Sequence, residues 1–141
     1  MPSNIVGMIC LDTIGCYSEE IGSQSLSFGG LLMPRRGDFL ALVANRASEA
    51  LLRQVSGTLA RETALRIRPV ILPTYCPGAW SSDHWPFWRE GFPAVMATDT
   101  APLRYPYYHT HADTPDKVDF EWLSEIVSGF RSVITEIARP R

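Results

Sequence analysis

Side chains that can bind a metal ion or transfer a proton are found at four places in the chain. Carboxylate oxygen and imidazole nitrogen are suitable zinc ligands, and zinc with an open coordination position lowers the pKa of a bound water, which favours hydrolysis. An aspartate at a strand end is also a common turn former or helix cap, so the spacing alone leaves both interpretations open. The four places are Asp12, the Ser82-Asp83-His84 turn, Asp99 and the Tyr107-Tyr108-His109 segment.

An alternation of strands and helices is expected to position these residues, which indicates an α/β fold in a single domain over residues 1–141. The apolar run 5–11 predicts a strand that is covered on both faces. Ligands of α/β sheets gather at the carboxyl ends of strands, and we expect all four places to lie there. The remaining expected elements are strand 38–44 (or a helical turn), helix 48–63, strand 67–72, a short helix at 82–91, strand 93–97 and helix 119–138.

Two segments without helix or strand periodicity are predicted to be loops. Residues 12–37 are rich in serine and glycine, including Gly29 and Gly30, and are expected to form a long surface loop. Residues 98–115 combine three prolines with His109 and its neighbouring tyrosines, which indicates a loop that carries chemistry.

The composition limits the classes of partner. The chain has 141 residues, of which 45% are hydrophobic and 20% charged, and its formal net charge is −2, so nucleic acid and anionic membrane are not expected partners. No run of apolar residues is long enough to predict a membrane span, and Met1-Pro2-Ser3-Asn4 lacks the features of a secretory signal, which leaves the compartment open. The three cysteines have no CxxC spacing and are expected to be free thiols.

Several motifs, taken in order, resemble those of the M28 family of zinc peptidases. The N-terminal motifs are Leu11-Asp12-Thr13-Ile14-Gly15, Gly22-Ser23-Gln24, Gly37-Asp38-Phe39 and Ser82-Asp83-His84-Trp85-Pro86-Phe87. The C-terminal motifs are Gly91-Phe92-Pro93-Ala94-Val95-Met96, Tyr107-Tyr108-His109-Thr110 and Asp113-Thr114-Pro115-Asp116. The resemblance covers nearly the whole chain, and it implies a three-layer zinc-peptidase-like fold with a mixed sheet, here incomplete at the N-terminal side.

The resemblance implies a two-zinc site to which this chain contributes two ligands. Asp12 would bind one ion and His109 the other, whereas the remaining ligands and the general-base glutamate would lie upstream of Asp12. No matching segment precedes Asp12, and Glu19-Glu20 follows it in a solvated loop. Because zinc normally needs at least three protein ligands, we expect this chain alone to be inactive. The missing strands would leave an exposed sheet edge that favours self-association.

The other polar residues have narrower expected roles. Ser82, Asp83 and His84 cannot form a catalytic triad, because adjacent side chains diverge. Asp83 is either a helix cap or a group that orients the substrate or a ligand, and His84 is expected to be structural. The remaining candidates for the site border are Ser82, Tyr107, Tyr108 and Trp80, whereas His111 is expected to face solvent.

Three functions remain in consideration. The first is a zinc aminopeptidase that cleaves N-terminal residues from peptide substrates by metal-activated water. A single-zinc glutaminyl cyclase resembles the Asp-His turn and the final histidine loop, although Tyr108 stands where such cyclases tend to have tryptophan. The third is a noncatalytic interaction module that kept the fold without the metal.

Overall fold

A four-stranded mixed sheet forms the centre of the computed structural model, which describes residues 5–25, 27–28, 31–32 and 34–139. The strands lie in the order β1 (Met8–Leu11), β6 (Ala94–Thr98), β4 (Leu40–Ala44) and β5 (Ile67–Ile71). β1 and β6 are parallel, β4 is antiparallel to β6, and β5 is parallel to β4. The carboxyl ends of β1 and β6 therefore meet at one end of the sheet, and those of β4 and β5 meet at the opposite end.

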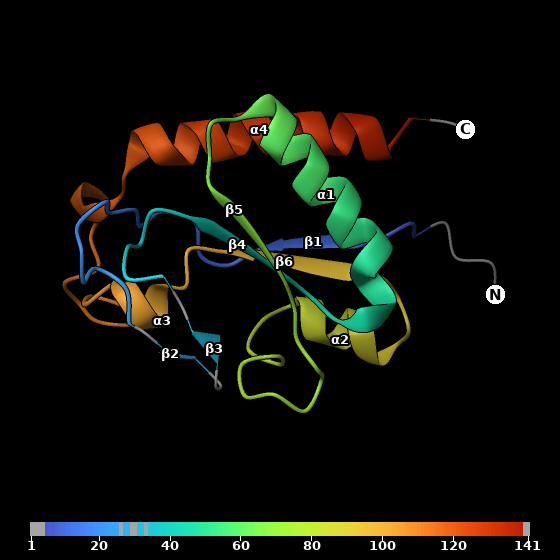
Figure 1. Ribbon diagram of the computed structural model, residues 1–141, viewed down its shortest axis with the longest axis horizontal. Helices are drawn as coiled ribbons and strands as arrows, with labels where there is room; N and C mark the ends of the chain where they lie inside the picture. The colour runs from blue at the N-terminus through green and yellow to red at the C-terminus, as the bar shows by residue number, and fades with distance from the viewer. Residues whose placement is uncertain (1–4, 26, 29–30, 33, 140–141) are drawn as a thin grey trace.

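Helices cover both faces of this sheet. Side chains alternate between the two faces along each strand, so each face presents apolar side chains on which helices pack. In Figure 1, α1 (Glu49–Glu62) and α4 (Phe120–Ile137) lie above the sheet and the short helix α2 (His84–Arg89) lies below it. Leu40, Leu42 and Ala44 pack with α1 and α4, whereas Val43 belongs to the apolar cluster on the α2 face. The sheet thus separates two apolar clusters.

The apolar spacing of the long helices explains why they form where the sequence predicts them. In α4, Trp122, Ile126, Phe130 and Val133 recur at intervals of three and four residues and are all buried. Asp119 caps this helix by accepting a hydrogen bond from the backbone N–H of Trp122 at 2.9 Å. Within the described ranges, no helix is both long enough and apolar enough to cross a membrane.

The start of β1 and the segment after it differ from the sequence expectations. β1 begins at Met8 and not at residue 5, because its partner β6 begins at Ala94, which pairs with Met8. The segment predicted as a loop over residues 12–37 contains a short hairpin of β2 (Ser27–Phe28) and β3 (Leu31–Leu32). The expected turn residues Gly29 and Gly30, like the N-terminal segment 1–4, lie outside the described residues.

The predicted loop over residues 98–115 contains the helix α3 (Ala101–Arg104). Pro102 stands in the first turn of α3, where the missing proline N–H costs no intrahelical hydrogen bond. Pro102, one of the three prolines on which the loop prediction rested, is therefore compatible with a short helix. A 3-10 turn follows at Pro115–Lys117, just before α4.

The two outer strands of the sheet differ in how they protect their edges. β5 carries Arg68 and Pro69, and a charge or a proline at an edge discourages pairing with another strand. β1 has neither, and Leu11 at its end is 46% exposed. The edge of β1 is therefore the one open to a further strand.

We expect this chain to self-associate through the β1 edge. Leu11→Lys should lower the weight-average mass measured by sedimentation equilibrium, because a lysine at an edge opposes strand pairing. Ile71→Lys on β5 is the matched control, and it should leave the mass unchanged because Pro69 already blocks that edge. Monomeric behaviour of the unmodified chain at high concentration would contradict this prediction.

The contact between α1 and α4 depends on the absence of a side chain at Gly129. A Cβ there would lie 2.6 Å from Thr63 Cγ2 and 2.7 Å from Leu59 Cδ2, whereas a Cβ at Gly57 in α1 meets nothing within 4 Å. Gly129→Ala should therefore lower the free energy of unfolding by about 1–3 kcal/mol through overpacking. Gly57→Ala should raise it by about 0.5–1 kcal/mol, as alanine favours a helix over glycine. Urea unfolding of both variants tests the pair.

Candidate functional site

Asp12 directly follows β1 and Asp99 directly follows β6, so both lie where these two parallel strands end. The Asp12 N–H donates to Ala97 O at 2.9 Å, and the Asp99 N–H donates to Thr13 O at 2.7 Å. Asp99 is only 1% exposed. Its carboxylate accepts hydrogen bonds from Thr13 Oγ1 at 2.6 Å and from the Cys16 N–H at 2.8 Å. The segment that follows Asp12 is thus held to the end of β6.

A cleft of about 260 Å³ opens at this end of the sheet and brings the two predicted metal ligands together. Asp12 lines it from the end of β1, and His109 lines it from the segment after α3. His109 has a φ of 58°, which is uncommon for a residue with a side chain, and its ring stacks on that of Tyr108 at a centroid distance of 3.9 Å. Asp99 and Tyr108 also border the cleft.

The donor set of the cleft matches part of a zinc site. Thr13 and Cys16 occupy both carboxylate oxygens of Asp99, whereas no described residue donates a hydrogen bond to the Asp12 carboxylate. Carboxylate and imidazole are both common zinc ligands. Among the described side chains, however, no group of three or more His, Cys, Asp or Glu residues is placed to hold a metal ion. The described part of the chain therefore offers two donors and not a complete ligand set.

An apolar pocket of about 110 Å³ adjoins the cleft. Asp12, Thr13 and Tyr108 line both spaces, so the pocket and the cleft meet at these residues. The pocket walls come from the α2 face of the sheet and include Val43, Val70, Leu72 and Met96. A ligand in the cleft would therefore have an apolar recess beside it.

The Ser82-Asp83-His84 turn does not follow a strand that ends at the cleft, and this expectation was wrong. β5 runs opposite to β1, so its carboxyl end lies at the far end of the sheet. The loop after β5 returns along the sheet face, where Ser82 Oγ lies 3.2 Å from Cys10 Sγ. The returning loop contributes Ser81 to the apolar pocket.

His84 has the structural role that the sequence suggested. Its side chain is fully buried, and Nε2 lies 2.8 Å from Ala79 O. Burial lowers the pKa of His84, with smaller opposing contributions from the Ala79 hydrogen bond and from the charges of Asp12 and Asp83. Asp83 occupies the N-cap position of α2, but its side chain makes no capping hydrogen bond.

The other proposed border residues lie outside the two spaces. Trp80 is 52% exposed, and neither it nor Ser82, Asp83 or Tyr107 lines the cleft or the apolar pocket. The Tyr107 ring instead faces Lys117, whose Nζ lies 5.4 Å from the ring centroid. Of the residues considered for substrate contact, Tyr108 is the one that the structure places at the site.

No sequence pattern predicted the role of Arg104, which holds together the long segment after β1. Arg104 Nη1 donates to the carbonyl oxygens of Cys16, Gly37 and Phe39, and Nε donates to Gln24 Oε1 at 2.7 Å. The guanidinium also lies over the Phe39 ring, and burial lowers the pKa of Arg104. A sequence pattern cannot separate such an arginine from a solvated one.

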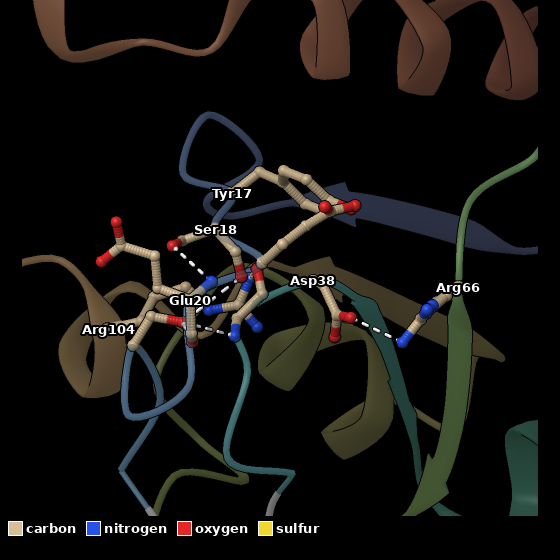
Figure 2. A network of polar contacts seen from close by, with 9 residues as sticks. Tyr17, Ser18, Glu20, Asp38, Arg66 and Arg104 are labelled. Carbon is tan, nitrogen blue, oxygen red and sulfur yellow. Dashed lines mark hydrogen bonds and ion pairs between the residues drawn. The ribbon is translucent and has the colours of Figure 1, made fainter.

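A second buried charge anchors the same segment at the start of β4. Asp38 Oδ2 accepts a hydrogen bond from Arg66 Nη1 at 2.6 Å, and the Asp38 side chain is 5% exposed. Figure 2 shows this ion pair beside β5, with Arg104 among the residues of the neighbouring loop. The two arginines thus fix the segment 16–39 at separate points.

Comparison with known proteins identifies a family and one relative. The model of a family described as peptidase family M28 matches residues 3–134. "Uncharacterized protein YfbL" of Escherichia coli (strain K12) is 36% identical over 124 residues, which are 86% of this chain and 38% of the relative. The chain thus spans well under half the length of that relative. No solved structure was found to match.

From the contacts of Arg104 with three carbonyl groups, we predict that its side chain contributes to the free energy of unfolding. Arg104→Lys keeps the charge but loses the planar fork that reaches three carbonyl groups, so it should lower the free energy of unfolding by about 2–4 kcal/mol. Arg53→Lys is the control, since Arg53 is exposed on α1 and its change should stay within about 0.5 kcal/mol. Equal urea midpoints for the two variants would show that Arg104 does not hold the segment.

Proposed function

Because this chain belongs to peptidase family M28, we propose that it forms part of a zinc-dependent aminopeptidase, which removes N-terminal residues from peptides. The observation that carries the proposal is the convergence of Asp12 and His109 on one cleft from distant parts of the sequence. Their separation of nearly one hundred residues makes this convergence a property of the fold. The proposal includes the three-layer zinc-peptidase arrangement, with further strands beside β1.

In this proposal Asp12 and His109 each hold one of two zinc ions. Zinc bound there supplies Lewis acidity, which is the chemistry that makes peptide hydrolysis feasible near neutral pH. The two residues are available for that role, because no described residue donates a hydrogen bond to the Asp12 carboxylate and His109 borders the open cleft. The other ligands and the general-base glutamate would come from outside this chain, so the chain alone is expected to be inactive.

Substrate contacts in this proposal involve Tyr108 and the apolar pocket. Tyr108 lines both spaces, so its hydroxyl can donate a hydrogen bond near the scissile carbonyl while its ring forms a wall of the pocket. Polarising that carbonyl assists attack only if the donor is already oriented. The stacking of Tyr108 on His109 supplies such orientation.

Two other functions remain distinguishable by experiment. A single-zinc glutaminyl cyclase would use Asp83 in proton transfer, but Asp83 lines neither the cleft nor the pocket, which favours the peptidase. A noncatalytic interaction module would need no zinc at all. The incomplete ligand set of the described residues keeps this alternative open to test.

Zinc content and peptide cleavage test the proposal directly. The product of the complete reading frame should retain about two zinc ions after dialysis and release N-terminal residues, whereas this chain alone should do neither. Asp12→Ala and His109→Ala should each lower both the zinc content and kcat/KM, the latter by about 100-fold or more, because each removes a ligand. Elemental analysis and mass spectrometry of the cleaved peptides are the measurements.

His111→Ala is the matched control for His109→Ala, because His111 is exposed and does not line the cleft. It should retain zinc and activity. Loss of ammonia from N-terminal glutamine without peptide cleavage would identify a cyclase. A complete product without zinc and without cleavage would leave the noncatalytic module as the function.

A further inference from the structure

We propose that Asp99 is a positioning residue, which fixes the direction in which Asp12 presents its carboxylate to the cleft. The inference rests on the proposed zinc-peptidase function, since it concerns one of the ligands of that site. Asp99 itself is 1% exposed, and both of its carboxylate oxygens already accept hydrogen bonds from the protein. Its effect on a bound ion would therefore pass through Asp12.

The backbone on both sides of the Asp12 side chain is tied to β6. Before the side chain, the Asp12 N–H donates to Ala97 O, and after it Thr13 O accepts from the Asp99 N–H at 2.7 Å. The Thr13 hydroxyl then donates to Asp99 Oδ1 at 2.6 Å. The residue after Asp12 is therefore held at two points by Asp99, which leaves the Asp12 backbone little freedom to turn.

A buried carboxylate is suited to holding the backbone after Asp12, because its oxygens need hydrogen-bond donors and the fold keeps those donors in fixed places. A charge that is removed from water is costly unless donors or an opposite charge compensate it. The Cys16 N–H supplies a second donor at 2.8 Å. Burial lowers the pKa of Arg104, and the nearby charge of Asp99 opposes that shift, so the two side chains interact electrostatically. Asp99 thereby joins the turn after Asp12 to the segment that Arg104 holds.

Asp38 offers a comparison within the same chain. It is also a buried aspartate with a short polar contact, and it also anchors the segment that follows β1. Its partner Arg66 is largely exposed, and neither residue lines the cleft. A substitution at Asp38 therefore removes a buried contact of the same segment without touching the backbone of Asp12.

The test compares Asp99→Asn and Asp38→Asn in the product of the complete reading frame. Asparagine can accept one hydrogen bond through its oxygen, but its amide nitrogen cannot accept the second, so Asp99→Asn releases either Thr13 or Cys16. Zinc affinity is measured by competition with a chromophoric chelator, alongside the thermal midpoint, kcat and KM. A second pair, Thr13→Val and Thr13→Ser, removes or keeps the hydroxyl that reaches Asp99.

We expect Asp99→Asn to weaken zinc binding by about 10–100-fold and to lower kcat more than it raises KM. Thr13→Val should also weaken zinc binding and lower kcat, whereas Thr13→Ser, which keeps the hydroxyl, should retain most of the zinc affinity and of kcat. Asp38→Asn should lower the thermal midpoint but leave the zinc affinity unchanged. This pattern would separate positioning from stability.

Equal thermal losses for Asp99→Asn and Asp38→Asn, with wild-type zinc affinity in both, would overturn the inference and leave the proposed function intact. Thr13→Val with wild-type zinc affinity would likewise show that the contact between Thr13 and Asp99 does not act on Asp12. An unmodified product that neither binds zinc nor cleaves peptides would overturn the proposed function, and the inference with it.

Discussion

The parallel pairing of β1 with β6 is the constraint on which the rest of the site depends. In this pairing Leu11, the last residue of β1, stands opposite Ala97, one residue before the end of β6. Asp12 and Asp99, the residues that follow the two strands, therefore emerge at the same end of the sheet. Antiparallel pairing would place their carboxylates at opposite ends. The cleft forms only because α3 and the His109 segment then return over this shared end.

A consequence of this geometry is that the segment after β1 needs its own supports. The described residues between Thr13 and Asp38 form little regular pairing, and their backbone carbonyl groups must find donors if they are buried. Arg104 supplies donors to three of them, and the ion pair between Asp38 and Arg66 secures the far end. The Asp38 carboxylate is buried and Arg104 is half-buried, and charges removed from water in this way are costly to unpair, so both anchors restrain the segment.

The sequence predicted the elements that carry strong periodicity and the residues that end them. The strand before Asp12 and the helices around Val55 and Ile126 could be predicted because their signals are local. For His84 the sequence indicates only a structural role, and its burial is a property of the fold. Strand direction is not a local property, so the same reasoning took β5 to end beside β1 and β6 and missed the loop that returns Ser82 along the sheet face. An apolar pattern shows which faces of a strand are buried, but it does not show which strand is its neighbour in the sheet.

The site residues also fall into those with a local sequence signal and those whose roles depend on the fold. Asp12 and His109 stood out because their residue types suit a metal and because the motifs around them resemble a known family. Asp99 stood out as a strand-end carboxylate, but its hydrogen bonds to Thr13 and Cys16 follow from a fold in which β1 and β6 are neighbours. Arg104 had no signal, because burial is decided by the segment that wraps around it and not by its own neighbours in sequence.

The unprotected edge and the incomplete ligand set have a common geometric origin. β1 is an outer strand of the described sheet, and Asp12 leaves it at the end where the cleft opens. Any strand that paired with β1 would have one of its ends beside Asp12, whichever direction it ran. Residues at that end would face the cleft from the side that is now open. Within the proposed function, the same edge that favours self-association of this chain is therefore the place where the remaining zinc ligands would enter.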